Sequence, residues 1–375
     1  MARQYWAWLD LGVMSPTRCR SLYPANATKA VVVGTLASAT SFCSQPLSRI
    51  RAVNLESLLT RFRSLDGSGP FDYEWCFHHD GGSRGTHIVV GSIVHGNEVG
   101  SLPAIVEVAE RLAAGDIDYG GRITFFLGNP EASRENVRFL ESDLNRVFTD
   151  TPPDDHEGAR SLELKPILRT ADMFLDLHQT IEPTESAFYT FPFNRDDWHW
   201  ARMIGNAPIW STRAPDASFS ANTCCVDEFV RGLDKPGLTL ELGQKGFSEE
   251  STDRTMSVLR RLLSATSDWD GGMASIEALA QEQPDFSFVE TAYAHPFSDR
   301  ALRLRDGLSN LIPVQSGETL SAPGSPTIEA PIDGLLMFPK YPDYDAQGQA
   351  IGKLPNELFR IVTTMDEHPT ERWNL

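Results

Sequence analysis

Four apolar runs of this sequence each end in, or lead directly into, a polar side chain that could take part in chemistry. In chain order these side chains are His95, Asn129, His178 and Glu241. In open α/β sheets, functional sites form at the carboxyl ends of the strands. Because four runs agree, we expect their side chains to converge on one edge of a sheet.

His95 and Glu98 suggest a metal-binding site. Two residues separate them at a turn between an apolar run and a helix-like segment, so an imidazole nitrogen and a carboxylate oxygen could face one point. His178 would complete the set, and three protein ligands with one open position are typical of catalytic zinc. Zn²⁺ also suits mixed nitrogen and oxygen ligands better than Mg²⁺ or Ca²⁺ does. On this motif alone, the alternative is a surface histidine beside a carboxylate at a helix N-terminus.

Two further acids accompany these candidates. Asp176 stands two residues before His178 and could hydrogen-bond that imidazole, or it could be an ordinary strand acid. Glu241 closes the fourth apolar run and is an ionisable candidate for the same site. The alternative for Glu241 is a paired acid at the end of a strand.

The apolar runs and the segments between them predict the elements that would position these residues. Strands are expected at residues 86–94, 122–128, 171–178 and 236–242, and helices at residues 100–112, 158–170 and 251–265. Runs that are apolar on both faces and alternate with helices predict an α/β fold with a mostly parallel or mixed central sheet and helices on both faces. From about Val289 onward, short β-like runs separated by Gly and Pro predict a small β-rich C-terminal domain.

Three parts of the chain are expected. Residues 1–52 are an N-terminal extension, residues 53–270 a catalytic domain, and residues 271–375 a linker with the β-rich domain. The extension holds six basic residues and one acid before Asn54, so a disordered segment, an export signal and an organelle-import signal are all open.

The composition excludes some partners. A net charge of −18 over 375 residues repels nucleic acids and anionic membranes, so neither is expected as a partner. Five cysteines without a CxxC pair indicate a reducing compartment, and we expect a cytoplasmic protein. Cys224 or Cys225 could be a nucleophile, although buried thiols are far commoner. The HHD sequence at residues 78–80 is expected in an exposed turn, and the aromatic run at residues 191–200 in the core.

Four motifs together carry a family resemblance. HGNE, GNPEASRENVRFLESDLNRVF, DLH and LELGQKG, in this order over about residues 86–250, resemble the succinylglutamate desuccinylase/aspartoacylase family of the zinc carboxypeptidase superfamily. The resemblance implies a zinc carboxypeptidase-like fold, one Zn²⁺ per chain, and an amidohydrolase that removes an acyl group from an N-acyl amino acid. It also implies a C-terminal β-domain that helps to close the pocket.

The resemblance assigns three groups of residues. The metal ligands it implies are His95, Glu98 and His178. The catalytic residues are the general base Glu241 and the oxyanion-stabilising Arg138. The substrate-binding residues are Asn145, Arg146 and Arg231. From the residues alone, Arg138 and Arg146 are eight apart and could instead lie on a solvated helical face.

The chain departs from the family after His178. Desuccinylases have an arginine-bearing turn where this chain has Gln179, Thr180 and Glu182, which calls succinylglutamate itself into question. The acidic Glu182 favours an amine-bearing substrate. A tyrosine of the β-domain contacts substrate in some relatives, and the candidates here are Tyr293, Tyr341 and Tyr344.

The leading hypothesis is therefore a zinc-dependent deacylase of small N-acyl amino acids. The alternatives are a zinc carboxypeptidase that cleaves C-terminal peptide residues, and a relative that binds metal and ligand without catalysis. The sequence leaves the acyl group, the amino acid and homo-oligomerisation open.

Overall fold

The computed structural model describes residues 54–65, 73–82, 85–215, 217–220, 222–266, 273–352 and 354–375. The predicted extension at residues 1–52 lies outside these ranges. The strands are β1 (Cys76–Asp80), β2 (His87–Ser92), β3 (Arg122–Leu127), β4 (Met173–Thr180), β5 (Phe188–Thr190), β6 (Ile209–Thr212), β7 (Gly237–Gln244), β8 (Ser287–Pro296), β9 (Pro313–Val314), β10 (Gly334–Met337) and β11 (Glu357–Thr364). The helices are α1 (Leu55–Arg63), α2 (Leu102–Ala113), α3 (Pro130–Arg134), η1 (Leu144–Arg146, 3-10), α4 (His156–Thr170), α5 (Arg195–Ile204), α6 (Val226–Arg231), α7 (Glu249–Thr266), α8 (Met273–Gln281) and α9 (Pro369–Arg372).

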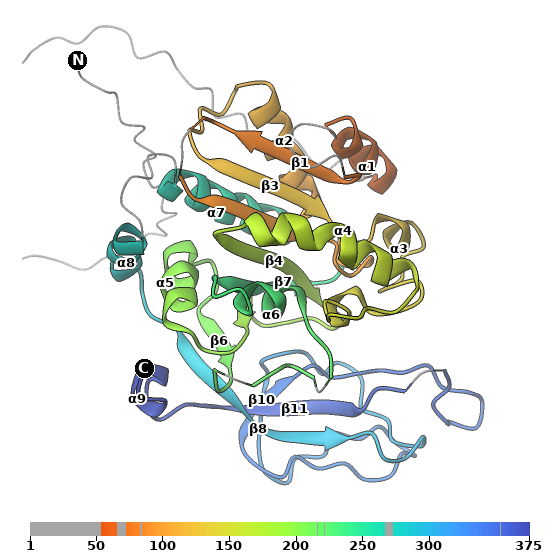
Figure 1. The fold of residues 1–375 in the computed structure, drawn as a ribbon. Coiled ribbons are helices and arrows are strands. Elements are labelled where there is room, and N and C mark those ends of the chain that lie inside the picture. Colours follow the sequence, from red (N-terminus) through yellow and green to blue (C-terminus); the bar gives the residue numbers. More distant parts are fainter. Residues whose placement is uncertain are drawn as a thin grey trace, which may run out of the picture. The chain divides into compact units, whose positions relative to one another are not determined.

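The described strands form one 11-stranded mixed sheet, in the order β1-β3-β2-β4-β7-β5-β6-β8-β11-β10-β9 (Figure 1). Strands β3, β2, β4 and β7 are parallel neighbours, as are β5, β6 and β8. Strand β1 is antiparallel to β3, and β5 is antiparallel to β7. The last four strands of the sheet, in the order β8-β11-β10-β9, are antiparallel neighbours. The prediction of a mixed α/β fold with a large central sheet is confirmed.

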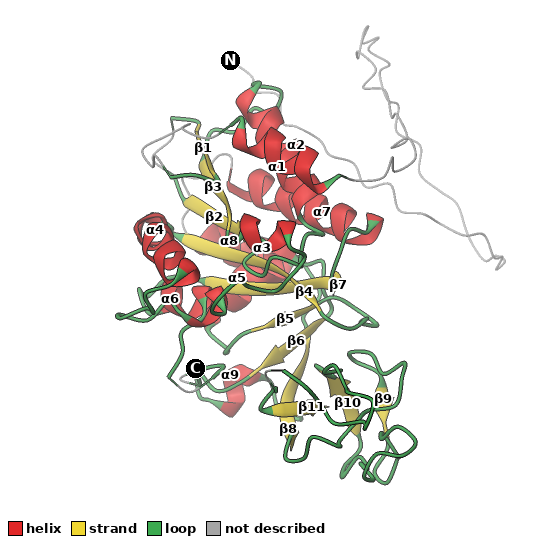
Figure 2. Cartoon of the chain, turned by 90° about the vertical axis from the view of Figure 1, so that its right-hand side faces the viewer, coloured by secondary structure: helices red, strands yellow, loops and turns green. Residues whose placement is uncertain are grey.

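Helices cover both faces of the strands that carry the candidate site (Figure 2). On β4, Met173, Leu175 and Leu177 pack in the core that also holds the buried residues of α2 and α7. The alternate residue Phe174 packs with α4 and α6 on the other face. Successive residues of a strand point to opposite faces of the sheet. Asp176 therefore lies on the same face as Phe174.

The C-terminal part is β-rich and continues the same sheet, because β8 pairs with β6 on one side and with β11 on the other. It also has a hydrophobic cluster of its own, which includes Leu304, Leu336 and Phe359. The predicted division into a catalytic domain and a separate β-rich domain at residue 270 stays a prediction.

Two smaller sequence predictions have opposite outcomes. The HHD sequence was expected in an exposed turn, and this is wrong: His78 and His79 lie in β1, where they pair with Thr124 and Ile123 of β3. The aromatic run at residues 191–200 packs in the core as expected, since Phe191, Phe193 and Trp200 are buried.

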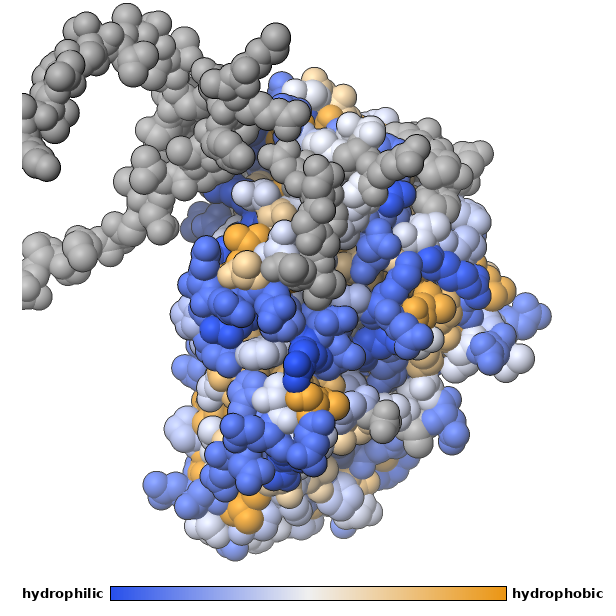
Figure 3. Space-filling model, turned by 60° about the vertical axis from the view of Figure 1, so that its left-hand side comes forward, coloured by the Kyte–Doolittle hydropathy of each residue, from blue (hydrophilic) through white to orange (hydrophobic). Residues whose placement is uncertain are grey.

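The surface in view in Figure 3 is mostly hydrophilic, with small separate apolar groups. Such a surface agrees with the net charge of −18. Within the described ranges, none of the helices combines the length and the apolar character that a membrane crossing requires.

Candidate active site

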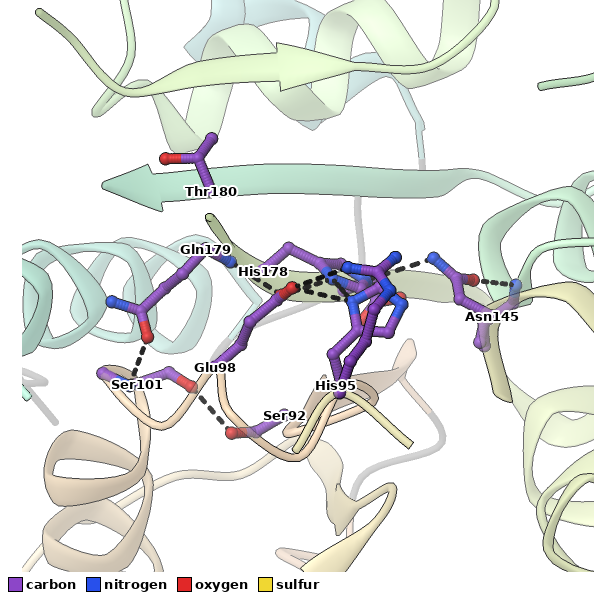
Figure 4. A network of polar contacts seen from close by, with 12 residues as sticks. Ser92, His95, Glu98, Ser101, Asn145, His178, Gln179 and Thr180 are labelled. Atoms are coloured by element: carbon purple, nitrogen blue, oxygen red, sulfur yellow. Dashed lines mark hydrogen bonds and ion pairs between the residues drawn. The ribbon is translucent and has the colours of Figure 1, made fainter. Parts of the chain in front are cut away.

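His95, Glu98 and His178 meet at the carboxyl ends of β2 and β4, and one ligand atom from each lies within 4.8 Å of the others (Figure 4). His95 Nδ1 is 2.9 Å from Glu98 Oε1, and His178 Nδ1 is 2.8 Å from Glu98 Oε2. The two Nδ1 atoms are 3.1 Å apart. All three side chains are buried. The structure therefore brings the three predicted metal ligands to one point.

The outer nitrogen of each imidazole faces a carboxylate. His95 Nε2 donates to Asp143 Oδ1 (3.1 Å), and His178 Nε2 donates to Asp176 Oδ2 (2.8 Å). An ionised carboxylate only accepts, so these partners place the protons on Nε2 and leave the Nδ1 lone pairs turned toward Glu98. Two lone pairs and a carboxylate at one point repel one another unless a cation lies between them. This donor set fits a bound metal ion.

Electrostatics at the cluster favour positive charge. Burial opposes the charged form of His178, but Asp176 and Glu98 outweigh it and raise the pKa of this imidazole well above its ordinary value. Burial likewise opposes ionisation of Glu98, but His95 and His178 lower the pKa of its carboxyl. The Glu98 side chain is thus held as a carboxylate in a buried place, which is the form that binds a metal.

The HGNE turn owes its shape to close backbone packing. A Cβ on Gly96 would lie 2.4 Å from the carbonyl carbon of Ala132 in α3, and Gly96 N donates to Arg138 O at 2.9 Å. Ile93, two residues before His95, is buried and has a φ of 47°, a left-handed conformation that costs a β-branched residue energy. The turn therefore leaves no room for a side chain at position 96. The strained residue Ile93 lies two positions before His95.

Strands β4 and β7 place Glu241 beside the cluster. His178 and Glu241 are register partners across this parallel pair. The side chain of Glu241 is buried, and within the described part of the chain its Oε2 atom has no hydrogen-bond partner. Burial first, and Glu98 next, raise the pKa of this carboxyl to about 8, although His178 and Arg138 oppose the shift. The alternative of an ordinary paired acid at a strand end is wrong.

Arg138 reaches the same cluster from the loop after α3. Its Nη1 donates to Glu98 Oε1 at 3.2 Å, and its Nε donates to Asp143 Oδ2 at 3.1 Å. Asp143 thus joins Arg138 to His95, and the sequence reasoning did not single it out. Its position in the sequence could have pointed to it, because only one leucine separates Asp143 from the predicted pair Asn145 and Arg146. The alternative of a solvated helical face for Arg138 is wrong, because the residue lies outside a helix.

The two predicted carboxylate-binding residues lie in η1. Asn145 Oδ1 accepts from Val226 N at 2.9 Å, which turns the amide Nδ2 toward His178 Nε2, 3.3 Å away. Arg146 Nη1 donates to its neighbour's carbonyl oxygen and lies 3.3 Å from Cys225 Sγ. Among the described residues, no carboxylate forms an ion pair with Arg146, although Arg146 is near enough to lower the pKa of Asp143.

Arg231 is not brought to this group. Its Nη1 donates to the carbonyl oxygen of Gly237, the first residue of β7, and forms an ion pair with Asp227 at 2.9 Å. Its guanidinium also lies over the Phe191 ring, 5.8 Å from the centroid. These contacts hold the beginning of β7, and the predicted role in substrate binding stays a prediction.

The departure after His178 has a structural explanation. Gln179 is buried, and its Oε1 accepts from Gly100 N at 2.7 Å, while its Nε2 donates to Gln244 O at 2.6 Å and to Ser251 Oγ at 3.2 Å. The residue therefore ties the turn that carries Glu98 to the segment after β7 instead of pointing at the metal ligands (Figure 4).

The segment that follows is held by the β-rich part. Asn310 Nδ2 donates to the carbonyl oxygens of Glu182 and Pro183, both at 3.1 Å, and Asn310 Oδ1 accepts from Phe338 N at 2.7 Å. Burial raises the pKa of the Glu182 carboxyl, and Lys245 opposes the shift. The predicted preference for an amine-bearing substrate stays a prediction.

Other candidates are occupied by structural contacts. The hydroxyls of the three tyrosines bond within the β-rich part, to His295 from Tyr293, to Arg305 O from Tyr341 and to Leu302 O from Tyr344. Burial raises the pKa of Cys224 to about 11 and that of Cys225 well above its usual value, so both are thiols near neutral pH. A nucleophilic cysteine is therefore not favoured.

Comparison with known proteins agrees with the motifs. The family model "Succinylglutamate desuccinylase/Aspartoacylase catalytic domain" matches residues 84–266. A succinylglutamate desuccinylase from Pseudomonas aeruginosa is 25% identical over 286 residues, which cover 68% of this chain and 80% of that protein. One from Yersinia pestis is 25% identical over 273 residues, covering 67% and 78%.

Solved structures show the same fold. A succinylglutamate desuccinylase from Vibrio cholerae has a TM-score of 0.57 at 20% identity and covers 78% of this chain and 86% of its own. The ectoine utilization protein EutE (DoeB) from Ruegeria pomeroyi, solved with product bound, has a TM-score of 0.56 at 18% identity, with coverage of 79% and 98%.

The fold and the site define a mixed α/β protein with a buried group of two histidines and one glutamate at the carboxyl ends of its parallel strands. The part of the chain that matches the family model, residues 84–266, is that of the succinylglutamate desuccinylase/aspartoacylase family, whose members are deacylases. The resemblance noted in the sequence is confirmed.

Proposed function

We propose that this chain is a zinc-dependent amidohydrolase that removes the acyl group from an N-acyl amino acid. The observation that carries the proposal is the convergence of two imidazole Nδ1 atoms and Glu98 at one point. Beside them lies the buried Oε2 of Glu241, which has no hydrogen-bond partner among the described residues. Zinc is the metal of choice because the donor set is mixed nitrogen and oxygen with three protein ligands.

Glu241 and Arg138 are the two residues that would act directly on the reacting atoms. A zinc ion held by His95, Glu98 and His178 would lower the pKa of a water molecule to about 7 and polarise the amide carbonyl. Glu241, with its raised pKa, would take a proton from the water and deliver it to the leaving amine. Arg138 would stabilise the negative charge that develops on the carbonyl oxygen, and loss of one such donor typically costs about 10²–10³ in rate.

Asn145 and Arg146 would hold the substrate carboxylate. The Asn145 amide is fixed by Val226, and the Arg146 guanidinium has free donors in a planar fork that matches a carboxylate. Asn145 and Arg146 directly follow Leu144, which is buried in the core beside α4. A rigid η1 would therefore orient the scissile amide without ordering a loop at each turnover.

Hydrolysis of matched substrates tests this proposal. The zinc-loaded chain would be assayed on acetyl-, succinyl- and formyl-amino acids and, in parallel, on blocked peptides with a free C-terminus. Turnover of N-acyl amino acids, abolished by a chelator and restored by Zn²⁺, supports the proposal. Turnover of the peptides alone would favour the carboxypeptidase alternative. Binding of N-acyl amino acids with a trace activity that Glu241→Gln leaves unchanged would favour a relative without catalysis.

A further inference from the structure

Glu157 is a buried carboxylate in the first turn of α4. Its Oε1 accepts from Asn129 Nδ2 and from Leu140 N, both at 2.7 Å. Its Oε2 accepts from Glu141 N and from Ser142 N, both at 3.1 Å. An ionised carboxylate has about four acceptor positions, and these donors fill them. The Glu157 side chain therefore fixes the segments that donate to it.

Three of the donors belong to one loop, residues 135–143, which joins α3 to η1. The structure describes every residue of this loop, and none of them is buried. Its apolar side chains Val137 and Leu140 are exposed. Such a loop gains little from hydrophobic packing, so its hydrogen bonds determine its shape. Glu157 accepts from three successive backbone N–H groups of the loop, as a bound anion does in a backbone nest.

The same loop carries two residues of the candidate active site. Arg138 Nη1 donates to Glu98 Oε1 at 3.2 Å. Asp143 Oδ1 accepts from His95 Nε2 at 3.1 Å. Glu157 holds the stretch between Arg138 and Asp143. Because a side chain that acts in a reaction must be held to within about 0.5 Å, the anchor of this stretch governs both contacts.

Two other hydrogen bonds join the loop to the start of α4. Ser142 Oγ donates to Asp155 Oδ1 at 3.2 Å, and His156 N donates to Glu141 Oε2 at 2.7 Å. The residues in these bonds are less buried than Glu157, so water competes for them more strongly. Glu157 is therefore the principal anchor of the loop on α4.

Glu157 is itself fixed to the sheet. Arg160, three residues further along α4, donates to the carbonyl oxygens of Leu127 and Gly128 at the end of β3, at 2.8 and 3.1 Å. Asn129 follows these two residues, and it caps α3 through its Oδ1 while its Nδ2 donates to Glu157. Asn129 was expected to lie at the site, and its connection to the site runs through Glu157.

We propose that Glu157 is a positioning residue for the hydrolysis. By fixing the loop, it holds Arg138 against Glu98 and holds Asp143 against His95. The inference rests on the proposed function and deepens it, because it adds a residue that acts on the reaction only through others.

Glu157→Gln tests the inference in the zinc-loaded chain. The amide keeps the size of the side chain, but its NH₂ group must face N–H donors, so part of the anchor is lost. We expect kcat for N-acyl amino acids to fall by about 10–100-fold, since a displacement of about 1 Å can cost about 10² in rate. KM should change little, because Asn145 and Arg146 follow the buried Leu144 and are held independently.

A double-mutant cycle with Arg138→Gln separates positioning from general destabilisation. If Glu157 acts through Arg138, then Glu157→Gln should lower kcat much less in a chain that already carries Arg138→Gln. The cycle is measured at saturating zinc, so that a weakened metal site does not enter the rates. A residue that only supports the fold would lower kcat by the same factor in both chains.

Two readouts do not depend on turnover. Hydrogen exchange of the backbone amides of residues 140–142 in the zinc-loaded chain should become faster in Glu157→Gln, because these amides lose their acceptor. Competition with a zinc chelator should show an affinity several-fold lower, because Asp143 no longer holds His95 as firmly.

Glu163→Gln is the matched control, since Glu163 also lies on α4 but its side chain is 50% exposed. It should leave kcat, exchange and zinc affinity unchanged. Asn129→Ser is a second test variant, because serine still caps α3 but does not reach Glu157. It should change all three quantities in the same direction as Glu157→Gln, and it carries the test if Glu157→Gln fails to fold.

Two results would overturn the inference: a kcat of Glu157→Gln equal to that of Glu163→Gln, or an equal loss of kcat with and without Arg138→Gln. An unmodified chain that hydrolyses no N-acyl amino acid would instead contradict the proposed function. The exchange and zinc-affinity comparisons would then decide by themselves whether Glu157 holds the loop against the metal ligands.

Discussion

His178 on β4 and Glu241 on β7 lie directly opposite each other in a parallel pair of strands. This register puts a candidate metal ligand and a candidate general base side by side without any contribution from a loop. A site built on strands is held more rigidly than one built on loops. His178 and Glu241 are therefore positioned by the sheet, whereas His95 and Glu98 are carried by the turn after β2.

Replacing Glu241 by glutamine should separate catalysis from metal binding. The amide keeps the shape of the side chain but cannot take a proton, so we expect hydrolysis to fall by about 10²–10⁴. Zinc content should stay at the level of the unmodified chain, because Glu241 is not in the ligand set. Steady-state rates and metal analysis on the same sample test this. Glu107→Gln, at a partly exposed position on α2, is the control, and a Glu241→Gln rate within a few-fold of that control would contradict the role.

Asp143→Asn should weaken the metal site. Asp143 holds both His95 Nε2 and Arg138 Nε, and loss of such a partner typically lowers metal affinity by about 10–100-fold. Competition with a zinc chelator measures the affinity. The control is Asp155→Asn, which changes the same kind of residue at the N-cap of α4, where asparagine caps equally well. Zinc binding as tight in Asp143→Asn as in this control would rule out the role.

Asp197 on α5 should make stability depend on pH. Burial raises the pKa of its carboxyl to about 8, although the nearby Arg231 opposes the shift. Between about pH 4 and pH 8 the unfolded chain releases this proton and the folded chain keeps it. The contribution of Asp197 to the free energy of unfolding therefore falls as pH rises, by at most about 1.4 kcal/mol per pH unit.

The Asp197→Asn variant removes this titration and can still accept from Gly237 N, as Asp197 Oδ1 does at 3.2 Å. Denaturant unfolding at pH 5.5 and pH 7.5 should show the variant gaining stability relative to the unmodified chain at the higher pH. Asp196→Asn, at an exposed position on the same helix, is the control. A stability difference between Asp197→Asn and the unmodified chain that is the same at both pH values would contradict the assignment.

The sequence predicted the central strands and the meeting of His95, Glu98 and His178 because two signals coincided. Buried parallel strands are apolar on both faces, so β2, β3, β4 and β7 were visible as runs. The expected convergence held for His95, His178 and Glu241, whereas Asn129 after β3 caps α3 and donates to Glu157 instead. The mixed character of the sheet was also expected. Strands β5 and β6 were not predicted, because they are short and lie within a segment whose aromatic residues fit a helix or a strand equally well.

Contacts between distant segments of the chain could not be predicted from the sequence. Asp143 and Gln179 act through partners far along the chain, and Gly96 is required by the approach of α3. The spacing of Arg231 from Glu241 suggested a site residue, yet Arg231 contacts Gly237 at the start of β7, and the strand rises by about 3.3 Å per residue between Gly237 and Glu241. A spacing along the chain does not specify which end of a strand a neighbouring helix will contact.

Zinc K-edge X-ray absorption on the purified chain, with its metal content measured, tests whether His95, Glu98 and His178 hold a zinc ion. We expect one zinc per chain, with two imidazole nitrogens at about 2.0–2.1 Å and the remaining ligands oxygens at about 2.0–2.2 Å. Substitution of either His95 or His178 by alanine should remove one imidazole contribution or the metal itself. Sulfur scattering near about 2.3 Å, or a zinc content unaffected by both substitutions, would contradict the account.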